Sequence, residues 1–569
     1  MRTTGLGASG ICLAGMLAWT ATVTALQAGL LPHKELVPTA DELSQLARVR
    51  SLLATSTKEN PNPVHIVFYG QSITLQPWWV QVSDGLRRLY PDADLTIENK
   101  AVSGFQDWAL SRIVVADLVP LQPDLVIFHA YGNGQGTDSL LADLRSKTTA
   151  EVLVQSDHCG IWDRLDEEET DPSKIAPADL VPYRNYVALP TAAHRHGACL
   201  AHIHDAWKAY LRSNDLPVTA LLSDGNVHLN DDGNLLMAEF VLAYLRPAPP
   251  STLPDPWNCA RVRTVEVGHD ALWRHRVLEC QVSGSSLTME LSGPLPTAVE
   301  IWVDGQRPSA FPELYGFSLV SPTHFANWPA LSRVGSEQPL LEEEWTMTPH
   351  DFSPDGQNFA FSVRGSLTGP DGEGTNTMRF VSNSGRVVIE AGDHWLGRAV
   401  YYSGGRPVPT GYQARWRVER RFLDELPAGL DPTASKRRVV RLVQGLADGP
   451  HRLRLVARDG IGGGIRTVRA FSPAGMAAIK DAGVGPVSVE AKLVVMETPM
   501  GLSLAWPQQF TDWRLESSSL SGPGAIWGPV AAAELHDWAG WRTLPLGPFA
   551  SPSFFRLVSG SDGAALPGQ

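Results

Sequence analysis

Cysteine is scarce in this sequence, with five residues among 569. Cys12 lies in the apolar N-terminal segment, and the spacing of Cys159, Cys199, Cys259 and Cys280 matches no zinc-binding pattern. We therefore expect no metal site. The even number of cysteines outside the N-terminal segment permits disulfides if the chain is exported.

Cys259 and Cys280 flank a segment with the pattern of a β-hairpin. A bridge between them would close a loop of about twenty residues, worth roughly 3 kcal/mol in the chain-entropy model. Cys159 and Cys199 are interpreted as buried thiols.

Positive charge is also in short supply. Lys and Arg number 47 against 60 Asp and Glu, for a formal net charge of −13. The basic cluster Lys436-Arg437-Arg438 is interpreted as part of a solvated strand or loop. Nucleic acid and anionic membranes are therefore excluded as expected partners.

Long hydrophobic runs are absent after the N-terminus. There, Arg2 precedes the apolar run ICLAGMLAWTATVTAL, with small residues near Ala25 and Ala28 that suit cleavage. We expect residues 1–28 to be a signal peptide, the protein to be exported to the periplasm or beyond, and no membrane span to remain. An uncleaved anchor helix is the alternative, although the run is short and interrupted by Thr.

At 569 residues the chain is too long for one core, so several domains are expected. Residues 36–248 alternate strand and helix patterns, which predicts a parallel sheet covered on both faces. Expected strands are 64–70, 93–102, 123–132 and 150–156, and expected helices are 75–90, 108–121, 137–148, 186–198, 204–214 and 232–245. The acidic segment 163–180 is predicted to be a solvated loop. In such sheets the ligand lies at the carboxyl ends of the strands.

The Pro-rich segment 246–257 is predicted to be a linker. Beyond it, short strand patterns separated by Gly, Asn and Asp predict an all-β sandwich over residues 249–478 and a small β module over residues 486–560. The segment GPDGEGTN, residues 369–376, is interpreted as a surface turn, with a calcium loop as the alternative.

Four short segments at predicted strand ends carry the candidate chemistry. Ser72 in YGQSIT is either a helix N-cap or a nucleophile. Gly104 in NKAVSG can present its backbone N–H, and Asn133 in YGNG can donate to a developing oxyanion. His228 in SDGNVHLN can serve as a general base. Each segment alone is explained as well by a turn or a cap.

Together, and in this order, the four segments resemble the sequence blocks of the SGNH, or GDSL-type, hydrolases. The resemblance covers roughly the first 40% of the chain without its signal segment and implies a flavodoxin-like three-layer α/β/α domain. An α/β-hydrolase elbow fits less well, because Thr74 stands where G-x-S-x-G requires Gly.

The resemblance also implies roles for individual residues. Ser72 would be the nucleophile, His228 the base and Asp224 the carboxylate that orients the base. The N–H groups of Ser72 and Gly104 and the amide of Asn133 would form the oxyanion hole. Such a mechanism needs neither a metal nor a cofactor.

Three departures from the family pattern matter. Gln71 replaces the usual Asp, as in the branch that resembles carbohydrate acetylesterases. The YGNG segment lacks a leading Gly and a following Asp, so Asn133 is aligned by counting along its strand. Gly225 stands where the Asp is usual, three positions before the His, and Asp224 lies one position further back. A Ser-His dyad oriented by a backbone carbonyl is therefore an alternative to the triad.

These observations favour an exported serine esterase that removes acyl groups, acetyl above all, from carbohydrate. Trp108 and Tyr131 are candidates for stacking against sugar rings, although core packing explains Trp108 equally well. Two alternatives stay open: a lipase, thioesterase or aryl esterase with the same catalytic residues, and a catalytically inactive glycan-binding surface protein.

Overall fold

The structure is a computed structural model that describes residues 29–166, 169–430, 439–459 and 462–473, together with the stretches 493–498, 501–507, 513–518, 526–531, 534–538, 541–545 and 554–559. The predicted signal peptide and the basic cluster Lys436-Arg437-Arg438 lie outside these residues. The chain divides into two compact units, one up to Asp481 and one from Ala482.

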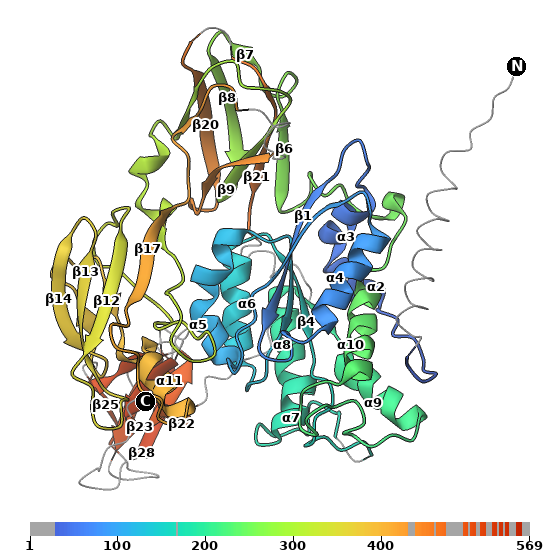
Figure 1. The fold of residues 1–569 in the computed structure, drawn as a ribbon, viewed down its shortest axis with the longest axis vertical. Coiled ribbons are helices and arrows are strands. Elements are labelled where there is room, and N and C mark those ends of the chain that lie inside the picture. The colour runs from blue at the N-terminus through green and yellow to red at the C-terminus, as the bar shows by residue number, and fades with distance from the viewer. Residues whose placement is uncertain are drawn as a thin grey trace, which may run out of the picture. The chain divides into compact units, whose positions relative to one another are not determined.

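The first unit begins with a parallel five-stranded sheet in the order β2-β1-β3-β4-β5 (Figure 1). This is the order of flavodoxin-like doubly wound sheets. The predicted strands are confirmed, and β5 is an additional one whose sequence, CLA, is too short to show a pattern. The strands are β1 (Pro63–Gly70), β2 (Asp94–Asn99), β3 (Leu125–His129), β4 (Glu151–Gln155) and β5 (Cys199–Ala201).

Helices cover both faces of this sheet, so the predicted α/β domain is confirmed. Alternate residues of β1 explain why: Ile66 and Phe68 belong to one core and Val67 and Tyr69 to the other. The helices around the first core are α3 (Ala47–Ala54), α4 (Trp78–Leu89), α9 (Ile203–Ser213) and α10 (Asp231–Tyr244), and those around the second are α5 (Asp107–Asp117), α6 (Gln135–Lys147) and α8 (Leu189–His196). The short helix α2 (Ala40–Ser44) precedes α3, and α7 (Leu180–Pro182) and a π-helical turn (Tyr183–Ala188) precede α8.

An antiparallel β-rich region follows, as expected. Two sheets enclose one hydrophobic core. They are β19-β9-β21-β6 and β18-β10-β20-β8-β7, with β6 (Val262–Glu266), β7 (Trp273–Arg274), β8 (Val277–Ser283), β9 (Ser286–Leu291), β10 (Val299–Val303), β18 (Glu425–Leu426), β19 (Val439–Gln444), β20 (Pro450–Ala457) and β21 (Ile465–Phe471).

The chain between β10 and β18 builds a further sheet, β11-β17-β12-β13-β14, with a core of its own. Figure 1 shows β12, β13 and β14 in yellow and β17 in orange, apart from the strands of the first β core. Its elements are β11 (Tyr315–Phe317), β12 (Glu344–His350), β13 (Ala360–Gly365), β14 (Gly369–Thr375), β17 (Ala414–Arg420), the pair β15 (Phe380–Val381) and β16 (Val388–Ile389), and helix α11 (Leu396–Tyr402).

The hairpin predicted between Cys259 and Cys280 is limited to the short antiparallel pair of β7 and β8, and β6 is not part of it. Strand β6 pairs with β21, far along the chain, whereas Cys280 lies on β8 in the other sheet. Both thiols are free, so no disulfide joins them. Cys159 and Cys199 are buried thiols, as predicted.

The segment 369–376 is not a surface turn, because it forms edge strand β14. Gly374 is required by packing, because a Cβ there would lie 2.7 Å from Cδ2 of Phe380. The predicted linker is packed against α3, where Ser51 donates to the carbonyl oxygen of Pro254 (2.6 Å).

The second unit contains two small antiparallel sheets, and Trp506, Leu515 and Leu544 are buried among its described residues. Its strands are β22 (Val494–Thr498), β23 (Gly501–Pro507), β24 (Trp513–Ser518), β25 (Gly528–Pro529), β26 (His536–Trp538), β27 (Trp541–Pro545) and β28 (Phe554–Ser559).

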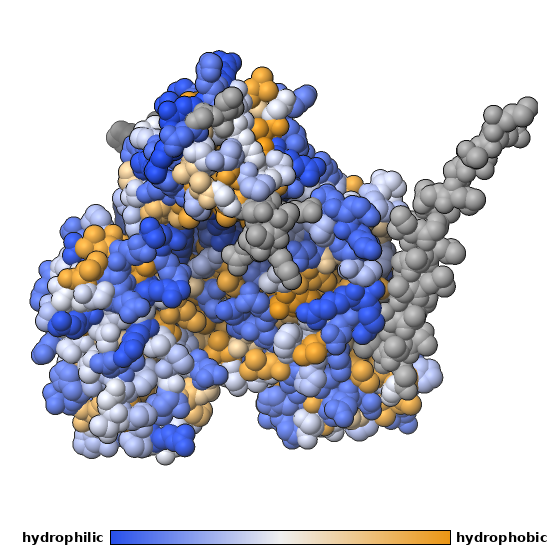
Figure 2. All heavy atoms as spheres, turned by 45° about the horizontal axis from the view of Figure 1, so that its top comes forward, coloured by the Kyte–Doolittle hydropathy of each residue, from blue (hydrophilic) through white to orange (hydrophobic). Residues whose placement is uncertain are grey.

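On the face shown in Figure 2, hydrophobic residues form separate small groups on a largely hydrophilic surface. Within the described ranges, no helix is long and apolar enough to cross a membrane.

Candidate active site

Ser72 lies in the turn that leads from β1 to α4. The helix begins six residues later, at Trp78, and Pro77 occupies the position before it. Ser72 is therefore not the N-cap of this helix. The turn is tight because Gly70 passes close to β3, where a Cβ on Gly70 would lie 2.1 Å from the carbonyl oxygen of His129. This geometry holds the hydroxyl at the carboxyl edge of the sheet.

The side chains of Ser72, His228 and Asp224 form one hydrogen-bonded row. Nε2 of His228 lies 3.0 Å from Oγ of Ser72, and Nδ1 of the same ring lies 2.6 Å from Oδ2 of Asp224. His228 and Asp224 lie in the loop before α10, whose N-cap is Asn230. Both side chains are more than one-third exposed, so solvent reaches this row.

Gly225 lets Asp224 reach the imidazole from four positions before it. Gly225 adopts a left-handed φ of 65°. The loop then folds so that Oδ1 of Asp224 accepts the backbone N–H groups of Asn226, Val227 and His228 (2.8–3.0 Å). Partial desolvation would raise the pKa of Asp224, but its hydrogen bonds to His228 and these N–H groups lower it well below the ordinary value. The carboxylate is therefore ionised beside the ring.

Gly104 follows β2 on a loop that runs alongside β1. It has a φ of 79°, a conformation that favours glycine, and Val102, two residues before it, donates its N–H to the carbonyl oxygen of Gly70 (2.9 Å). Gln71 is buried and ties this loop to the loop after β3. Its amide nitrogen donates to the carbonyl oxygen of Phe105 (2.9 Å), and its amide oxygen accepts from the N–H of Tyr131 (3.0 Å).

The side chain of Asn133 is not oriented for the oxyanion hole that the sequence predicts. Its side chain is exposed and turns toward the start of α6, where Oδ1 accepts from the N–H of Gln135 (3.1 Å). Within the described part of the chain, no hydrogen bond joins Asn133 to Ser72 or His228. The structure thus brings together Ser72, His228 and Asp224, and leaves Asn133 at the rim.

A buried carboxylate that sequence reasoning missed shapes the loop of Asn133. Asp107, at the start of α5, accepts the N–H groups of Gly134 (2.9 Å) and Thr137 (3.2 Å). Burial raises the pKa of Asp107 although these bonds oppose the change. A Cβ on Gly132 would lie 1.9 Å from Oδ1 of Asp107, so only glycine fits there. The only sequence signal was an acidic residue in the first turn of a helix.

Asp157 and His158, which follow β4, hold the loops on both sides of the candidate site. Nε2 of His158 lies 2.7 Å from the carbonyl oxygen of Val227, in the loop of His228. Asp157 accepts from Nε of Arg184 (2.6 Å), and Nη1 of Arg184 donates to the carbonyl oxygen of Gly132 (3.1 Å). No local sequence pattern indicates these partners.

These two residues differ in their protonation. Burial lowers the pKa of His158 to about 3, and the neighbouring His129 adds to this, so the ring is neutral. Burial would raise the pKa of Asp157, but Arg184 and His129 lower it far below its usual range. The neutral imidazole of His158 and the ionised carboxylate of Asp157 are therefore neighbours in the chain.

The two aromatic candidates occupy different surroundings. The hydroxyl end of Tyr131 is buried, and the guanidinium of Arg184 lies 5.0 Å from its ring centroid. Trp108 is 39% exposed on α5. Nowhere in the described ranges do three or more His, Cys, Asp or Glu side chains group as metal ligands would.

A scan against protein families finds no match for the chain, and a search of curated proteins finds none either. Among solved structures, the acetyl xylan esterase AlAXEase matches 32% of this chain and 98% of its own, with 18% identity and a TM-score of 0.27. A two-domain esterase (CEX) active on acetylated mannans matches 75% of this chain and 95% of its own, with 13% identity and a TM-score of 0.29. A catalytic mutant of Axe2, an acetylxylan esterase from Geobacillus stearothermophilus, matches 32% and 94%, with 15% identity and a TM-score of 0.27. At these scores the similarity assigns the chain to no family.

Proposed function

We propose that this protein is an exported serine esterase of the SGNH type that removes acyl groups, acetyl above all, from carbohydrate. The observation that supports this best is the row of Ser72, His228 and Asp224 at the carboxyl edge of a parallel sheet. A hydroxyl, an imidazole and an ionised carboxylate in hydrogen-bonded sequence are what nucleophilic acyl transfer requires. Export rests on residues 1–28, outside the described structure.

In this proposal Oγ of Ser72 attacks the ester carbonyl carbon while Nε2 of His228 takes the hydroxyl proton. The C–O bond of the tetrahedral intermediate then breaks, and His228 returns the proton to the leaving sugar oxygen. Water, deprotonated by the same nitrogen, next attacks the acyl-enzyme and releases the acid. Asp224 holds the ring in one tautomer and stabilises the imidazolium that forms at each step.

The developing oxyanion would be met by the backbone N–H groups of Ser72 and Gly104. Asn133 would complete the hole after its exposed side chain turns away from Gln135, a rotation that breaks two hydrogen bonds, of 3.1 Å and 3.4 Å. Each such donor contributes about 3–4 kcal/mol to lowering the barrier. The backbone of the Asn133 loop is held in place by Asp107 and by Arg184, which is paired with Asp157.

The experiment that tests this function measures release of p-nitrophenol from p-nitrophenyl acetate, and of acetate from acetylated xylan and acetylated mannan. The purified protein is compared with its Ser72→Ala variant. The proposal expects turnover by the natural sequence and its loss in the variant, with an unchanged thermal unfolding midpoint. If both proteins are equally inert on all three substrates, the esterase function is wrong.

A further inference from the structure

Helix α11 of the β-rich region lies near α5 (Figure 1). It carries exposed aromatic side chains. We call Trp108, Trp395, Arg398, Tyr401 and Tyr402 the aromatic platform. Trp108 comes from the α/β domain, and the other four follow it by almost 300 residues in the sequence. The platform therefore exists only where the two regions meet.

The centre of the platform is a stack of two indole rings under a cation. The rings of Trp108 and Trp395 have centroids 5.3 Å apart and planes 19° apart. The guanidinium carbon of Arg398 lies 5.2 Å and 4.9 Å from the same two centroids. Trp395 is buried while Trp108 is 39% exposed, so the stack presents one indole to solvent and orients it.

Two tyrosines extend this surface. Tyr401 is 63% exposed and Tyr402 is 62% exposed, and their ring centroids are 5.2 Å apart. Tyr402 also packs edge-on against Trp328 at 5.3 Å. Exposed aromatic rings gathered at one place mark a binding surface more often than single exposed apolar residues do.

The platform is continuous with the candidate active site. Trp328 donates from Nε1 to the carbonyl oxygen of Ser103 (2.7 Å), and its ring lies 3.2 Å from where a Cβ on Gly104 would be. On the other side, Trp395 stacks on Phe105 at 4.4 Å. Gly104 and Phe105 belong to the loop that Gln71 ties to the turn of Ser72. One contact thus separates the platform from the proposed oxyanion hole.

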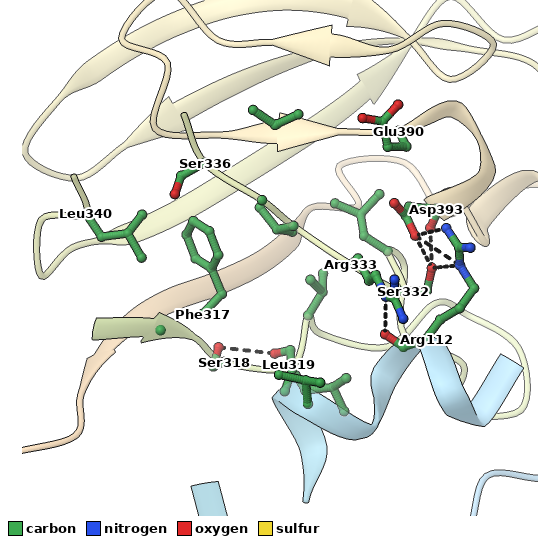
Figure 3. A pocket seen from close by; sticks show the side chains of 18 of the residues that line it. Arg112, Phe317, Ser318, Leu319, Ser332, Arg333, Ser336, Leu340, Glu390 and Asp393 are labelled. Carbon is green, nitrogen blue, oxygen red and sulfur yellow. Dashed lines mark hydrogen bonds and ion pairs between the residues drawn. The ribbon is translucent and has the colours of Figure 1, made fainter. Parts of the chain in front are cut away.

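The helix face that carries Trp108 is also anchored to the β-rich region. Arg112 lies one turn further along α5, on the same face, and reaches Asp393 (2.5 Å) and Ser332 (3.2 Å). Figure 3 shows these contacts in a pocket of about 560 Å³ whose lining includes none of the platform residues. Because Asp393 is two residues before Trp395, this partly buried ion pair helps to fix the position of the stack.

Arg398 offers unused hydrogen-bond donors. In the part of the chain that the structure describes, its guanidinium makes ring contacts with Trp108 and Trp395 and has neither a carboxylate partner nor a hydrogen bond. Arg112, the nearby cation, is paired with Asp393. A fork of donors above flat aromatic rings suits a ring-shaped ligand with hydroxyl or carboxylate groups around its edge.

We propose that the aromatic platform binds pyranose rings of the acylated polysaccharide that flank the ester. The inference deepens the esterase function proposed above and rests on it for the identity of the reaction. Sugar rings have apolar faces that stack on Trp and Tyr, and hydroxyl edges that accept from Arg398. The β-rich region would therefore take part in substrate recognition, and not only in carrying the catalytic domain.

The test measures binding apart from turnover. Ser72→Ala protein is titrated with xylohexaose, mannohexaose and a hexamer of galacturonate, and heat or tryptophan fluorescence is recorded. The inference expects at least one of them to bind, with Kd raised at least tenfold by adding Trp108→Ala or Tyr402→Ala. Trp108→Phe, which keeps an aromatic ring, should recover most of the affinity. Binding of the galacturonate alone, abolished by Arg398→Ala, would assign Arg398 to a carboxylate.

Phe352→Ala is the matched control, because Phe352 is 38% exposed and lies outside the platform. It should leave the Kd unchanged. Tyr401→Ala and Tyr402→Ala remove exposed rings, so their thermal midpoints should stay close to that of the parent protein. No binding of any of the three hexamers, or binding that the platform variants leave intact, would overturn the inference. If the natural sequence does not hydrolyse the ester substrates, the esterase function is contradicted, but the binding result still stands.

Discussion

The imidazole of His158 donates to the carbonyl oxygen of Val227 across 2.7 Å, and Val227 is the residue before His228. The ring is buried and neutral, so its single proton is on Nε2, which is the donor, and Nδ1 is unprotonated. The same strand end holds the opposite side of the site, since Asp157 binds Arg184 and Arg184 binds Gly132. His158 is thus a positioning residue for the proposed general base.

Replacing His158 by Leu should lower kcat on p-nitrophenyl acetate at least tenfold, because the partly buried carbonyl of Val227 loses its donor and the loop of His228 relaxes. An unpaired buried acceptor costs about 1–3 kcal/mol. KM should change little, because His158 does not touch the substrate. His158→Gln keeps an N–H donor and should restore kcat to within about threefold. Equal losses in Leu and Gln variants would refute the positioning role.

The same histidine predicts a pH dependence of stability. Its pKa in the folded protein is about 3, below the ordinary 6.5, so between these values the unfolded chain binds a proton that the folded chain does not. Its contribution to the free energy of unfolding is present above pH 6.5 and falls by about 1.4 kcal/mol for each pH unit below it. Urea midpoints at pH 7, 5.5 and 4.5 should therefore fall more steeply for the natural sequence than for His158→Gln. Parallel curves would contradict this.

Asp224→Asn distinguishes a triad from a dyad. If the carboxylate orients and stabilises the imidazolium, kcat should drop by about 10⁴-fold, as expected when the ring loses its tautomer partner. The three backbone N–H groups can still bind the amide oxygen of Asn, so the loop should keep its fold. A loss below about tenfold would mean that a backbone carbonyl suffices and that His228 works in a dyad with Ser72. Initial rates across pH 6–9 would settle the choice.

Gly104→Ala should reduce kcat on p-nitrophenyl acetate at least tenfold. The new Cβ strains a φ of 79° and lies 3.2 Å from Cζ2 of Trp328, so the loop must shift and carry the proposed oxyanion donor away. Gly305→Ala is a matched control, because Gly305 has a φ of 80° and nothing within 4 Å of the added Cβ. Similar activity in the two variants would remove Gly104 from the oxyanion hole.

The sequence predicted the parts of the molecule that depend on local pattern. The strands and helices of the α/β domain follow hydrophobic periodicity, and Ser72, Gly104 and His228 stand at strand ends or just before a helix, where a doubly wound sheet gathers ligand contacts. Strand β5 was missed because three residues carry no period.

What the sequence could not predict depends on contacts between distant residues. Strand β6 pairs with β21 across some 200 residues, so the hairpin predicted between Cys259 and Cys280 is limited to β7 and β8. The stack of Trp108 on Trp395 and the bond from His158 to Val227 have no local signature. The glycines of β14 resembled a turn, although Gly374 packs against Phe380, which lies outside the strand.

The central claim is that Ser72 is a nucleophile activated by His228. It is tested most directly by incubating the protein with a fluorophosphonate, which phosphonylates activated serines, and locating the adduct by peptide mass spectrometry. The account predicts one adduct, on the peptide that contains Ser72, and a large decrease in its rate of formation in His228→Ala. The account would be contradicted if no adduct formed, or if the adduct lay outside the Ser72 peptide and formed equally fast in His228→Ala.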